Sequence, residues 1–240
     1  MEVSQNKPVE IEISSASVFY GKERILENLN LSIKEQRVGF IGRNGSGKTT
    51  LLRILAGLQE LHNGKVLIDG TEVAKKRNEA IRKVGIIFQN PDHQIIFPTV
   101  GEELRFGLTQ LGLKRNEADL KVIACLKEYD KVNWFERSIS TLSQGQKHLV
   151  CLLSILLMKP MVLLLDEPFT GIDIPTQRKL ERYLGSLKQT IIHVSHVPET
   201  FENYQRLIWM DEGVVKADGP PKTVTKKYKD AMNNYNEKNI

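Results

Sequence analysis

The sequence predicts an α/β fold in which a doubly wound parallel sheet carries an antiparallel β lobe and an inserted α-helical subdomain. Three observations support this prediction. A glycine-rich loop at residues 42–49 lies between an apolar run and a helical pattern, in the order strand, loop, helix. Residues 161–165 are apolar without alternation, as in a strand buried on both faces of a parallel sheet. Residues 91–158 show helical spacing, so we expect the subdomain there.

The antiparallel lobe is expected around the glycine-rich loop. Strand-like segments occur at 11–18, 29–33 and 65–68. Asn63-Gly64 and Asp69-Gly70 are dipeptides typical of tight hairpin turns. Because hairpins join antiparallel strands, these segments predict an antiparallel sheet beside the parallel one.

The glycine-rich loop fits the phosphate-binding pattern G-x-x-x-x-G-K-[ST]. Its glycines let backbone N–H groups point at phosphate oxygens, and the helix that begins there adds the positive end of its dipole. Lys48 is expected to meet the outer phosphates, and the Thr49 hydroxyl to ligate Mg²⁺. The motif therefore predicts a P-loop NTPase core of the RecA-like type, which binds a nucleoside triphosphate. The residues expected at the nucleotide are Gly42, Arg43, Asn44, Gly45, Ser46, Gly47, Lys48, Thr49 and Thr50.

Two acids, Asp166 and Glu167, follow the buried strand at 161–165. In a P-loop sheet the carboxyl end of such a strand lies beside the phosphates. Asp166 is therefore expected to hold Mg²⁺ through a water molecule, and Glu167 to face the attacking water. On their own, the two acids are equally consistent with an ordinary strand end.

A capped helix is predicted to begin at Ser143. Ser143 and Gln146 form a capping-box pair at the start of an apolar helical pattern. The Ser143 hydroxyl and the backbone N–H of Gly145 would then be available to an anion, although an ordinary N-cap without a ligand is the simpler alternative. Thr99 and Glu102 form a second capping pair within the helical region.

Composition limits the class of protein. The chain has 240 residues, of which 40% are hydrophobic, enough for one sizeable core and a smaller lobe. Its longest apolar run, 149–158, is too short to cross a bilayer, and residues 1–8 lack the apolar core of a secretory signal. Cys125 and Cys151 lie in apolar helix-like segments, which predicts reduced, buried thiols in a cytoplasmic protein.

The net charge of +5 comes partly from lysines near the C-terminus. Such a tail is usually a solvated end. It is also compatible with binding to an anionic membrane surface or to nucleic acid. The lysines are Lys222, Lys226, Lys227 and Lys229.

The order of the motifs resembles that of the ATP-binding cassette ATPases over about residues 10 to 225. The resemblance implies a cassette domain at 9–225, with the helical subdomain at about 91–158, and a C-terminal tail at 226–240. It also implies that the nucleotide is ATP, bound with Mg²⁺.

The resemblance assigns roles to residues outside the phosphate loop. Tyr20 would stack on adenine. Gln89 would sense Mg²⁺ and the attacking water, and His196 would contact the terminal phosphate, so both would be catalytic. His193 is expected to be an ordinary strand residue with a local hydrogen bond, and Asp173, in the D-loop, would cross to a partner subunit. The signature, which would complete the ATP site of the facing subunit, is Ser143, Gln144, Gly145 and Gln146.

Three positions depart from the family pattern. Gln144 stands where the signature usually has glycine, and Leu149 where an arginine is frequent. Gly171 in the D-loop replaces a bulkier small residue. Gln144 and Leu149 leave open how strongly ATP closes the dimer, and the sequence does not indicate the effect of Gly171.

Residues 88–100 point to one branch of the family. They are similar to the Q-loop stretch F-Q-N-P-D-x-Q-h-h-x-P-T-V of the energy-coupling-factor ATPases, which drive uptake of vitamins and transition-metal ions. In these proteins the groove beside the loop receives a coupling helix of a membrane subunit. Ile95 and Phe97 are expected to be exposed for such a partner, whereas Ile96 is expected to pack inside its own subunit. The short C-terminal end and residues 149–152 favour the biotin-type member.

The resemblance therefore implies an ATP-binding and ATP-hydrolysing motor subunit of a membrane importer, peripheral to the cytoplasmic face of the cell membrane and bound to a membrane-embedded subunit. The transported compound is expected to be a vitamin or a metal ion, with biotin favoured. A head-to-tail dimer is implied, either a homodimer or a heterodimer with a related ATPase, and no nucleic-acid partner is expected. The alternative is a soluble ATPase of the same family that remodels a protein or nucleic-acid complex.

Overall fold

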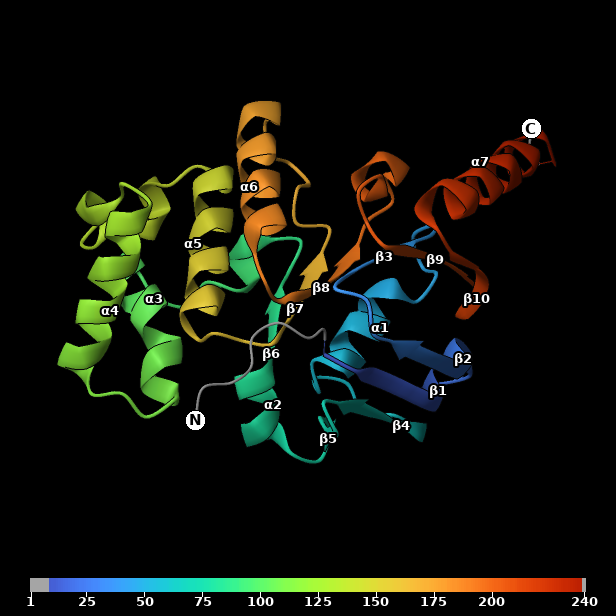
Figure 1. Cartoon of the computed structure of the whole chain (residues 1–240), viewed down its shortest axis with the longest axis horizontal. Helices are drawn as coiled ribbons and strands as arrows, with labels where there is room; N and C mark the ends of the chain where they lie inside the picture. The colour runs from blue at the N-terminus through green and yellow to red at the C-terminus, as the bar shows by residue number, and fades with distance from the viewer. Residues whose placement is uncertain (1–8, 239–240) are drawn as a thin grey trace.

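Two sheets and a set of helices make up residues 9–238, the part of the chain that the computed structural model describes (Figure 1). The expectation that residues 1–8 lack a secretory signal, and residues 239–240 of the expected tail, lie outside this range. Across the described residues, no helix combines the length and the apolar character needed to cross a membrane.

A six-stranded sheet forms the core and positions the loops of the site. Its strands are β3 (Arg37–Ile41), β6 (Val84–Ile87), β7 (Val162–Asp166), β8 (Thr190–Val194), β9 (Arg206–Asp211) and β10 (Val214–Gly219). They lie in the order β10-β9-β3-β8-β7-β6, with β10 antiparallel to β9 and every other pair parallel. Every residue of β7 and β8 is buried, as predicted for central strands covered on both faces.

A four-stranded antiparallel sheet lies beside the core. Its strands are β1 (Ile11–Tyr20), β2 (Glu23–Ile33), β4 (Asn63–Ile68) and β5 (Thr71–Glu72), in the order β2-β1-β4-β5. The predicted turn at Asp69 and Gly70 is confirmed, because these residues join β4 to β5 with φ of 47° and 71°. The predicted hairpin turn at Asn63-Gly64 is wrong, because this pair begins β4 and is paired with β1. A Cβ on Gly64 would lie 2.3 Å from the Ser14 carbonyl oxygen, so glycine allows β1 and β4 to approach there.

Helices cover both faces of the core sheet and form a separate group beyond β6. The helices of the described chain are α1 (Lys48–Leu55), α2 (Arg77–Lys83), α3 (Val100–Gln110), α4 (Arg115–Glu128), α5 (Gln144–Leu157), α6 (Ile174–Ser186) and α7 (Pro221–Lys238), with 3₁₀ turns η1 (Pro91–His93), η2 (Val132–Trp134), η3 (Ile139–Thr141) and η4 (Pro198–Phe201). Between β6 and β7, helices α3, α4 and α5 share an apolar cluster of their own, which forms the helical subdomain. Cys151 is buried and Cys125 half-buried; both thiols are free, and burial raises their pKa to about 12 and about 11.

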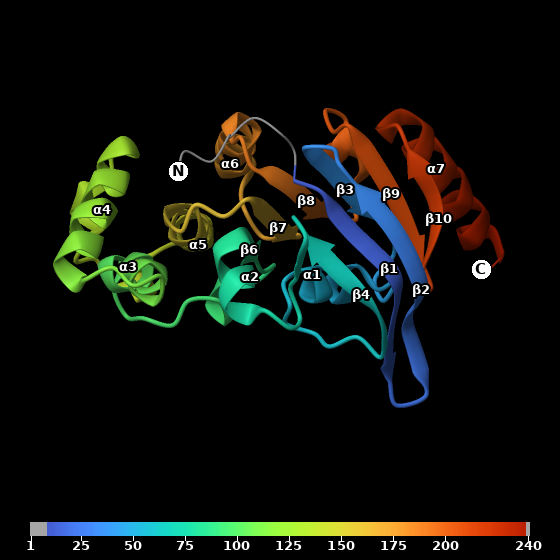
Figure 2. The same cartoon turned by 60° about the horizontal axis from the view of Figure 1, so that its bottom comes forward.

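Helix α7 lies against β9 and β10, at the opposite end of the molecule from α3 and α4 (Figure 2). Val224 and Tyr228 are buried, and the Tyr228 ring lies edge-on to Trp209 with centroids 5.7 Å apart. The expected start of a tail at residue 226 therefore falls inside a packed helix, because this apolar pair is hidden among exposed lysines. Neither β9 nor β10 is predicted from the sequence. In β10, Lys216 interrupts the apolar pattern, whereas β9 has an apolar run at residues 207–210 that could have indicated a strand.

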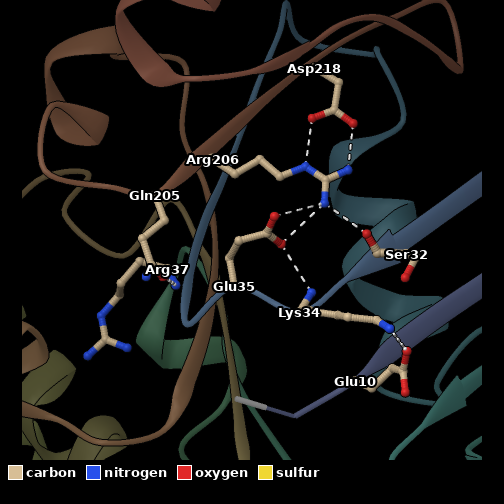
Figure 3. A network of polar contacts seen from close by, with 8 residues as sticks. All are labelled: Glu10, Ser32, Lys34, Glu35, Arg37, Gln205, Arg206 and Asp218. Atoms are coloured by element: carbon tan, nitrogen blue, oxygen red, sulfur yellow. Dashed lines mark hydrogen bonds and ion pairs between the residues drawn. The ribbon is translucent and has the colours of Figure 1, made fainter. Parts of the chain in front are cut away.

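Arg206 of β9 joins the two sheets through a network of polar contacts (Figure 3). Its guanidinium donates to both oxygens of Asp218 on β10, at 2.7 and 2.6 Å. Its remaining nitrogen donates to the Ser32 carbonyl of β2 (2.8 Å) and to Glu35 (3.2 Å). The bond to Asp218, helped by Glu35, raises the pKa of Arg206. The antiparallel lobe is thus held against the edge of the core sheet.

Candidate nucleotide-binding site

The phosphate loop connects β3 to α1 and passes close to neighbouring backbone on both sides. Gly47 is the N-cap of α1 with a φ of 95°, a left-handed conformation that glycine adopts without strain. At Gly42 a Cβ would lie 2.1 Å from the carbonyl oxygen of Met210, so glycine alone fits between β3 and β9. The two glycines bring the loop to the N-terminus of α1, where free N–H groups and the helix dipole favour an anion.

Lys48 lies inside this loop. Its ammonium group donates to the carbonyl oxygens of Gly42 (2.8 Å) and Arg43 (2.7 Å) and to the Ser46 hydroxyl (3.2 Å). The side chain is 6% exposed, and burial lowers its pKa. Lys48 is therefore held at the wall of the cavity that the loop surrounds, where it can donate to phosphate oxygens.

The two acids at the end of β7 differ in burial and direction. Asp166 is buried, and its Oδ1 accepts from the Thr49 hydroxyl at 3.2 Å; burial raises the pKa of Asp166, and the bond from Thr49 opposes this effect. Glu167 has a φ of 48°, which is uncommon for a residue with a side chain, and its N–H donates to the Val194 carbonyl (3.0 Å). Its Oε1 lies 2.8 Å from Nδ1 of His196. The strand end thus presents one acid to Thr49 and the other to His196.

His193 and His196 have different environments although they are close in sequence. His193 is a buried residue of β8 whose Nδ1 lies 2.8 Å from the Tyr204 hydroxyl, and burial lowers its pKa to about 3. The His196 side chain is 55% exposed and borders the cavity. His193 is thus a strand residue with a local hydrogen bond, as expected.

These residues surround one cavity of about 450 Å³. It brings together most of the nucleotide, metal and catalytic residues predicted from the sequence. Gly42 and Arg43 lie behind the lining as acceptors for Lys48. The lining residues are Tyr20, Glu23, Ile25, Asn44, Gly45, Ser46, Gly47, Lys48, Thr49, Thr50, Gln89, Asp166, Glu167, Val194 and His196.

Three lining residues, Glu23, Ile25 and Val194, are not predicted from the sequence. Glu23 is paired with Tyr20 across the β1–β2 turn, so Glu23 and Ile25 enter the cavity through the register of that hairpin. A hairpin assignment around Gly21 would have placed Glu23 beside Tyr20. Val194 enters because β8 ends at the cavity next to β7.

The signature residues lie outside this cavity, at the start of α5. The predicted capping box is confirmed: Ser143 Oγ accepts from the Gln146 N–H (3.3 Å), and Gln146 Oε1 accepts from the Ser143 N–H (3.1 Å). Gly145 is buried against α6, where a Cβ would lie 2.7 Å from Cγ2 of Thr176. Ser143, Gln144, Gly145 and Gln146 are therefore not brought to their own chain's phosphate loop. Their role in a facing subunit stays a prediction.

The D-loop residues Gly171 and Asp173, which precede α6, and Leu149 of α5 are also absent from the lining of the cavity. The Asp173 carboxylate caps α6 by accepting from the Thr176 N–H (3.0 Å) and hydroxyl (2.9 Å), and these bonds lower the pKa of Asp173. Gly171 has a φ of 76°, which a bulkier residue would adopt only with strain. Leu149 is half-buried against two apolar clusters, an environment that favours leucine over arginine.

Residues 88–100, called the Q-loop below, run from the end of β6 through η1 to the start of α3. Gln89 lines the nucleotide cavity. Farther along, the N–H groups of Ile96 and Phe97 donate to one carboxylate oxygen of Glu103, at 2.9 and 3.0 Å. Glu103 is buried on α3, so the helical subdomain holds the second half of the loop.

The expected exposure of the Q-loop side chains is wrong. Ile96 is 70% exposed, whereas Ile95 is partly buried against the helical cluster. Phe97 is half-buried beside Phe106 of α3, with ring centroids 5.2 Å apart. The two bonds to Glu103 hold the loop in a turn that directs Ile95 inward and Ile96 outward.

The residues predicted to hold Mg²⁺ have suitable chemistry. Thr49 and Asp166 place a hydroxyl and a carboxylate 3.2 Å apart at the cavity, and Gln89, whose amide has an oxygen, lines the same cavity. Mg²⁺ prefers hard oxygen ligands and keeps several of its waters, so this sparse oxygen set fits it. Within residues 9–238, no group of three or more His, Cys, Asp or Glu side chains forms another candidate metal site.

Comparison with known proteins identifies the family. Residues 26–170 match the ABC transporter family. The chain is 43% identical to the biotin transport ATP-binding protein BioM of Rhodobacter capsulatus, over 87% of this chain and 89% of that protein. It is 33% identical to the energy-coupling factor transporter ATP-binding protein EcfA1 of Ligilactobacillus salivarius, over 93% of this chain and 82% of that protein.

Solved structures agree on the fold. CbiO1 from Clostridium perfringens, described as part of the ABC transporter complex CbiONQ, matches with a TM-score of 0.77 at 28% identity and covers 93% of this chain and 92% of its own. A bacterial ABC transporter cassette solved as a dimer matches with a TM-score of 0.77 at 25% identity, over 88% of this chain and 98% of that one. The chain therefore belongs to the ABC transporter family of ATP-binding proteins, and it is an ATPase that binds ATP with Mg²⁺.

Proposed function

We propose that this ATPase is the motor subunit of an importer of the energy-coupling-factor type. It lies at the cytoplasmic face of the membrane, where a membrane-embedded subunit holds it. Biotin is the favoured substrate, ahead of other vitamins and metal ions, and the relatives named for biotin transport and for energy coupling support this choice. The observation that carries the proposal is the Q-loop, which borders the nucleotide cavity at Gln89 and exposes apolar Ile96.

The Q-loop offers a short physical path from ATP to a partner. Gln89 senses the cavity, and the chain then passes through η1 to Ile96 on the outer surface. Phe106 of α3 is 37% exposed and adjoins the loop through its ring contact with Phe97. Exposed apolar side chains on a loop favour a protein partner, and Ile96 with Phe106 suits an apolar face of a helix from a membrane subunit.

The geometry around Glu167 supports the following proposed roles in hydrolysis. Its carboxylate acts as general base: it takes a proton from the water whose oxygen attacks the terminal phosphorus, while the bond from that phosphorus to ADP breaks. His196 hydrogen-bonds to Glu167 through Nδ1 at 2.8 Å, so it orients the carboxylate and leaves its other ring nitrogen for the terminal phosphate. Lys48 balances the charge on the phosphate oxygens.

Mg²⁺ would be held by Thr49 directly, by Asp166 through water and by Gln89. When bound, it neutralises charge on the phosphate oxygens. The distance of 3.2 Å between the Thr49 hydroxyl and Asp166 supports this assignment, because both oxygens meet at one point of the cavity wall. Tyr20 lines the same cavity, and its exposed ring is available to stack on adenine.

A second ATPase chain completes the site. Ser143 and Gly145 belong to a helix N-terminus that does not border its own cavity, so they act on the nucleotide of a facing subunit, together with Asp173. Two copies of this chain would form two complete sites in a head-to-tail dimer. A related ATPase in place of the second copy is the alternative.

The proposal is tested by fractionation and uptake. Expressed alone, the protein is expected in the soluble fraction; expressed with its membrane subunits, it is expected to move to the membrane and to support ATP-dependent uptake of labelled biotin. If the cells take up labelled nickel, cobalt or another vitamin and not biotin, the assignment of biotin as the substrate is wrong, and the motor role is still supported. A protein that stays soluble beside every membrane subunit of this type would instead be a soluble remodelling ATPase.

A further inference from the structure

Side chains from the first turn of α5 hold the carboxylate of Asp92 in the Q-loop. Lys147 Nζ donates to Asp92 Oδ1 at 2.6 Å, and Gln144 Nε2 donates to Oδ2 at 3.3 Å, so each carboxylate oxygen has one donor. Gln144 and Lys147 are three residues apart and therefore lie on one face of the helix. The N–H of Asp92 donates to Asn90 Oδ1 at 2.9 Å, which fixes the η1 turn that carries the carboxylate.

His148, on the same face of α5, makes a second contact with the Q-loop. Its Nε2 lies 3.2 Å from the carbonyl oxygen of Gln89, and because a carbonyl can only accept, Nε2 carries the hydrogen. Nδ1 is buried and has no hydrogen-bond partner within the described chain, and burial lowers the pKa of His148 to about 4. The backbone of Gln89 is thus held by α5 while its side chain lines the nucleotide cavity.

We propose that Asp92 is a positioning residue that fastens the Q-loop to the signature helix. The Asp92 clamp, formed by Asp92, Gln144 and Lys147, makes the loop and the first turn of α5 move as one unit. Ser143 and Gly145 lie on that turn, so a displacement of the loop displaces the groups that meet ATP in the facing subunit. Gln144, which replaces the usual signature glycine, thereby holds the Q-loop of its own subunit.

The two sides of the clamp differ in exposure. The Lys147 side chain is 16% exposed and the Asp92 side chain 47% exposed, so the clamp is shielded from solvent on the lysine side alone. Glu103 holds the other half of the Q-loop through Ile96 and Phe97, so both halves are fastened to the helical subdomain. The inference rests on the proposed function in taking the Q-loop as the docking site of a membrane subunit and the signature as part of the facing subunit's ATP site; the contacts of Asp92 do not depend on either.

The first test changes Asp92 in the Q-loop and measures amide hydrogen exchange at the signature. Asp92→Ala removes both acceptors of the clamp. In the isolated chain, we expect amide hydrogen exchange to rise at least about threefold both in residues 89–97 and in residues 143–148, because contacts of this kind shift local opening by severalfold. ATP turnover should fall about threefold to tenfold while ATP binding to the isolated chain stays unchanged, because Lys48 and its loop are untouched.

The matched control is Arg105→Ala. Arg105 pairs with Asp119 at 2.6 Å between α3 and α4, within the same subdomain and away from the Q-loop. It should leave exchange in residues 89–97 and 143–148 unchanged. The inference is overturned if Asp92→Ala raises exchange in residues 89–97 alone, or if the control variant raises exchange in both segments equally.

A double-mutant cycle separates the clamp from a general loss of packing. Lys147→Ala and Asp92→Ala should each lower turnover, and the double variant should lose no more than either single change. Exchanging the charges, with Asp92→Lys and Lys147→Asp together, should restore turnover to within about twofold of wild type, because the ion pair is rebuilt. Additive losses and a charge exchange without rescue would overturn the clamp. Both tests use the isolated ATPase, so failure of the transporter assignment in fractionation leaves their result intact.

Discussion

The phosphate loop and the Q-loop both begin at the carboxyl end of a parallel core strand, yet they are held in different ways. In the phosphate loop, Lys48 bonds to groups no more than 6 positions away. In the Q-loop, Asp92 and Gln89 are held by residues of α5 that are 55 and 59 positions away. Lys48 is therefore positioned from within its own loop, whereas the Q-loop takes its position from the helical subdomain and can follow its movements.

Removing the general base, Glu167, should give the largest effect. It should lower the rate of ATP hydrolysis and leave ATP binding unchanged. Glu167→Gln keeps the shape of the residue but removes the proton acceptor, so turnover should fall by about 10²- to 10⁴-fold while ATP binding persists. Steady-state hydrolysis and an ATP titration measure the two quantities. Glu202→Gln, an exposed acid that does not line the nucleotide cavity, is the control. Near-normal turnover in Glu167→Gln would remove Glu167 from this role.

Changing the phosphate loop should act on binding itself. Lys48→Ala removes a charge-assisted donor to phosphate, so ATP affinity should fall by about tenfold to 100-fold, as for the loss of a hydrogen bond to a charged group. Equilibrium titration with ATP checks this. Unchanged affinity would mean that the bonds from Lys48 to Gly42 and Arg43 serve only to fold the loop.

Mixing two inactive variants tests whether the signature works across subunits. Lys48→Ala damages the phosphate side of a site, and Ser143→Arg damages the signature side. If the signature acts in the facing subunit, each heterodimer keeps one intact site, and an equal mixture should recover about a quarter of wild-type turnover. A mixture as inactive as its components would place both lesions in the same chain's site.

The exposed side of the Q-loop should matter for a partner and not for ATP. Ile96→Ser removes an apolar anchor, and central anchors contribute about 1–2 kcal/mol at an interface, so binding to a membrane subunit should weaken about fivefold to 30-fold. Leu120→Ser on α4 is the matched control, because both side chains are 70% exposed. Co-purification measures the loss, and ATP turnover in solution should be unchanged. Equal losses in both variants would contradict the docking role of the Q-loop.

The smallest effect concerns pH and the contact between α5 and the Q-loop. Burial lowers the His148 pKa from 6.5 to about 4, so the unfolded chain binds more protons between these values. The stability that neutral His148 contributes is complete above pH 6.5 and is lost as the pH falls toward 4, at up to about 1 kcal/mol per pH unit. His148→Gln keeps a donor for Gln89 and should flatten this slope in urea unfolding between pH 4.5 and 7. An unchanged slope would show that His148 does not titrate on unfolding.

The difference between the loops also explains what could be predicted from the sequence. The phosphate loop, Asp166 and Glu167 can be predicted because a local motif and the end of one buried strand indicate them. Ile95 and Ile96 lie in the opposite environments to those predicted, because Glu103 on α3 decides which of them turns outward. Local pattern carries no information about such distant bonds.

Two other features differ in how far the sequence indicates them. Glu23 is paired with Tyr20 across a two-residue turn, so a local hairpin pattern is enough to predict its position. The packing of α7 through Val224 and Tyr228 onto β9 and β10 depends on a surface that exists only after the core has formed. The order of motifs still located the site, because parallel strands bring their carboxyl ends to one edge of the sheet.

The Arg206 network also affects the spacing of the residues proposed to contact the nucleotide. Arg206 holds the core sheet to β2, the strand that is paired with β1, at whose end Tyr20 lies. Tyr20 and Lys48 both line the cavity, and this network joins the parts of the chain that carry them, so the spacing between the two side chains is set by the fold. Gln89 lines the same cavity but is bonded to His148 of the helical subdomain. The two sheets therefore set the length of nucleotide that fits, and the helical subdomain carries the residue that responds to its presence.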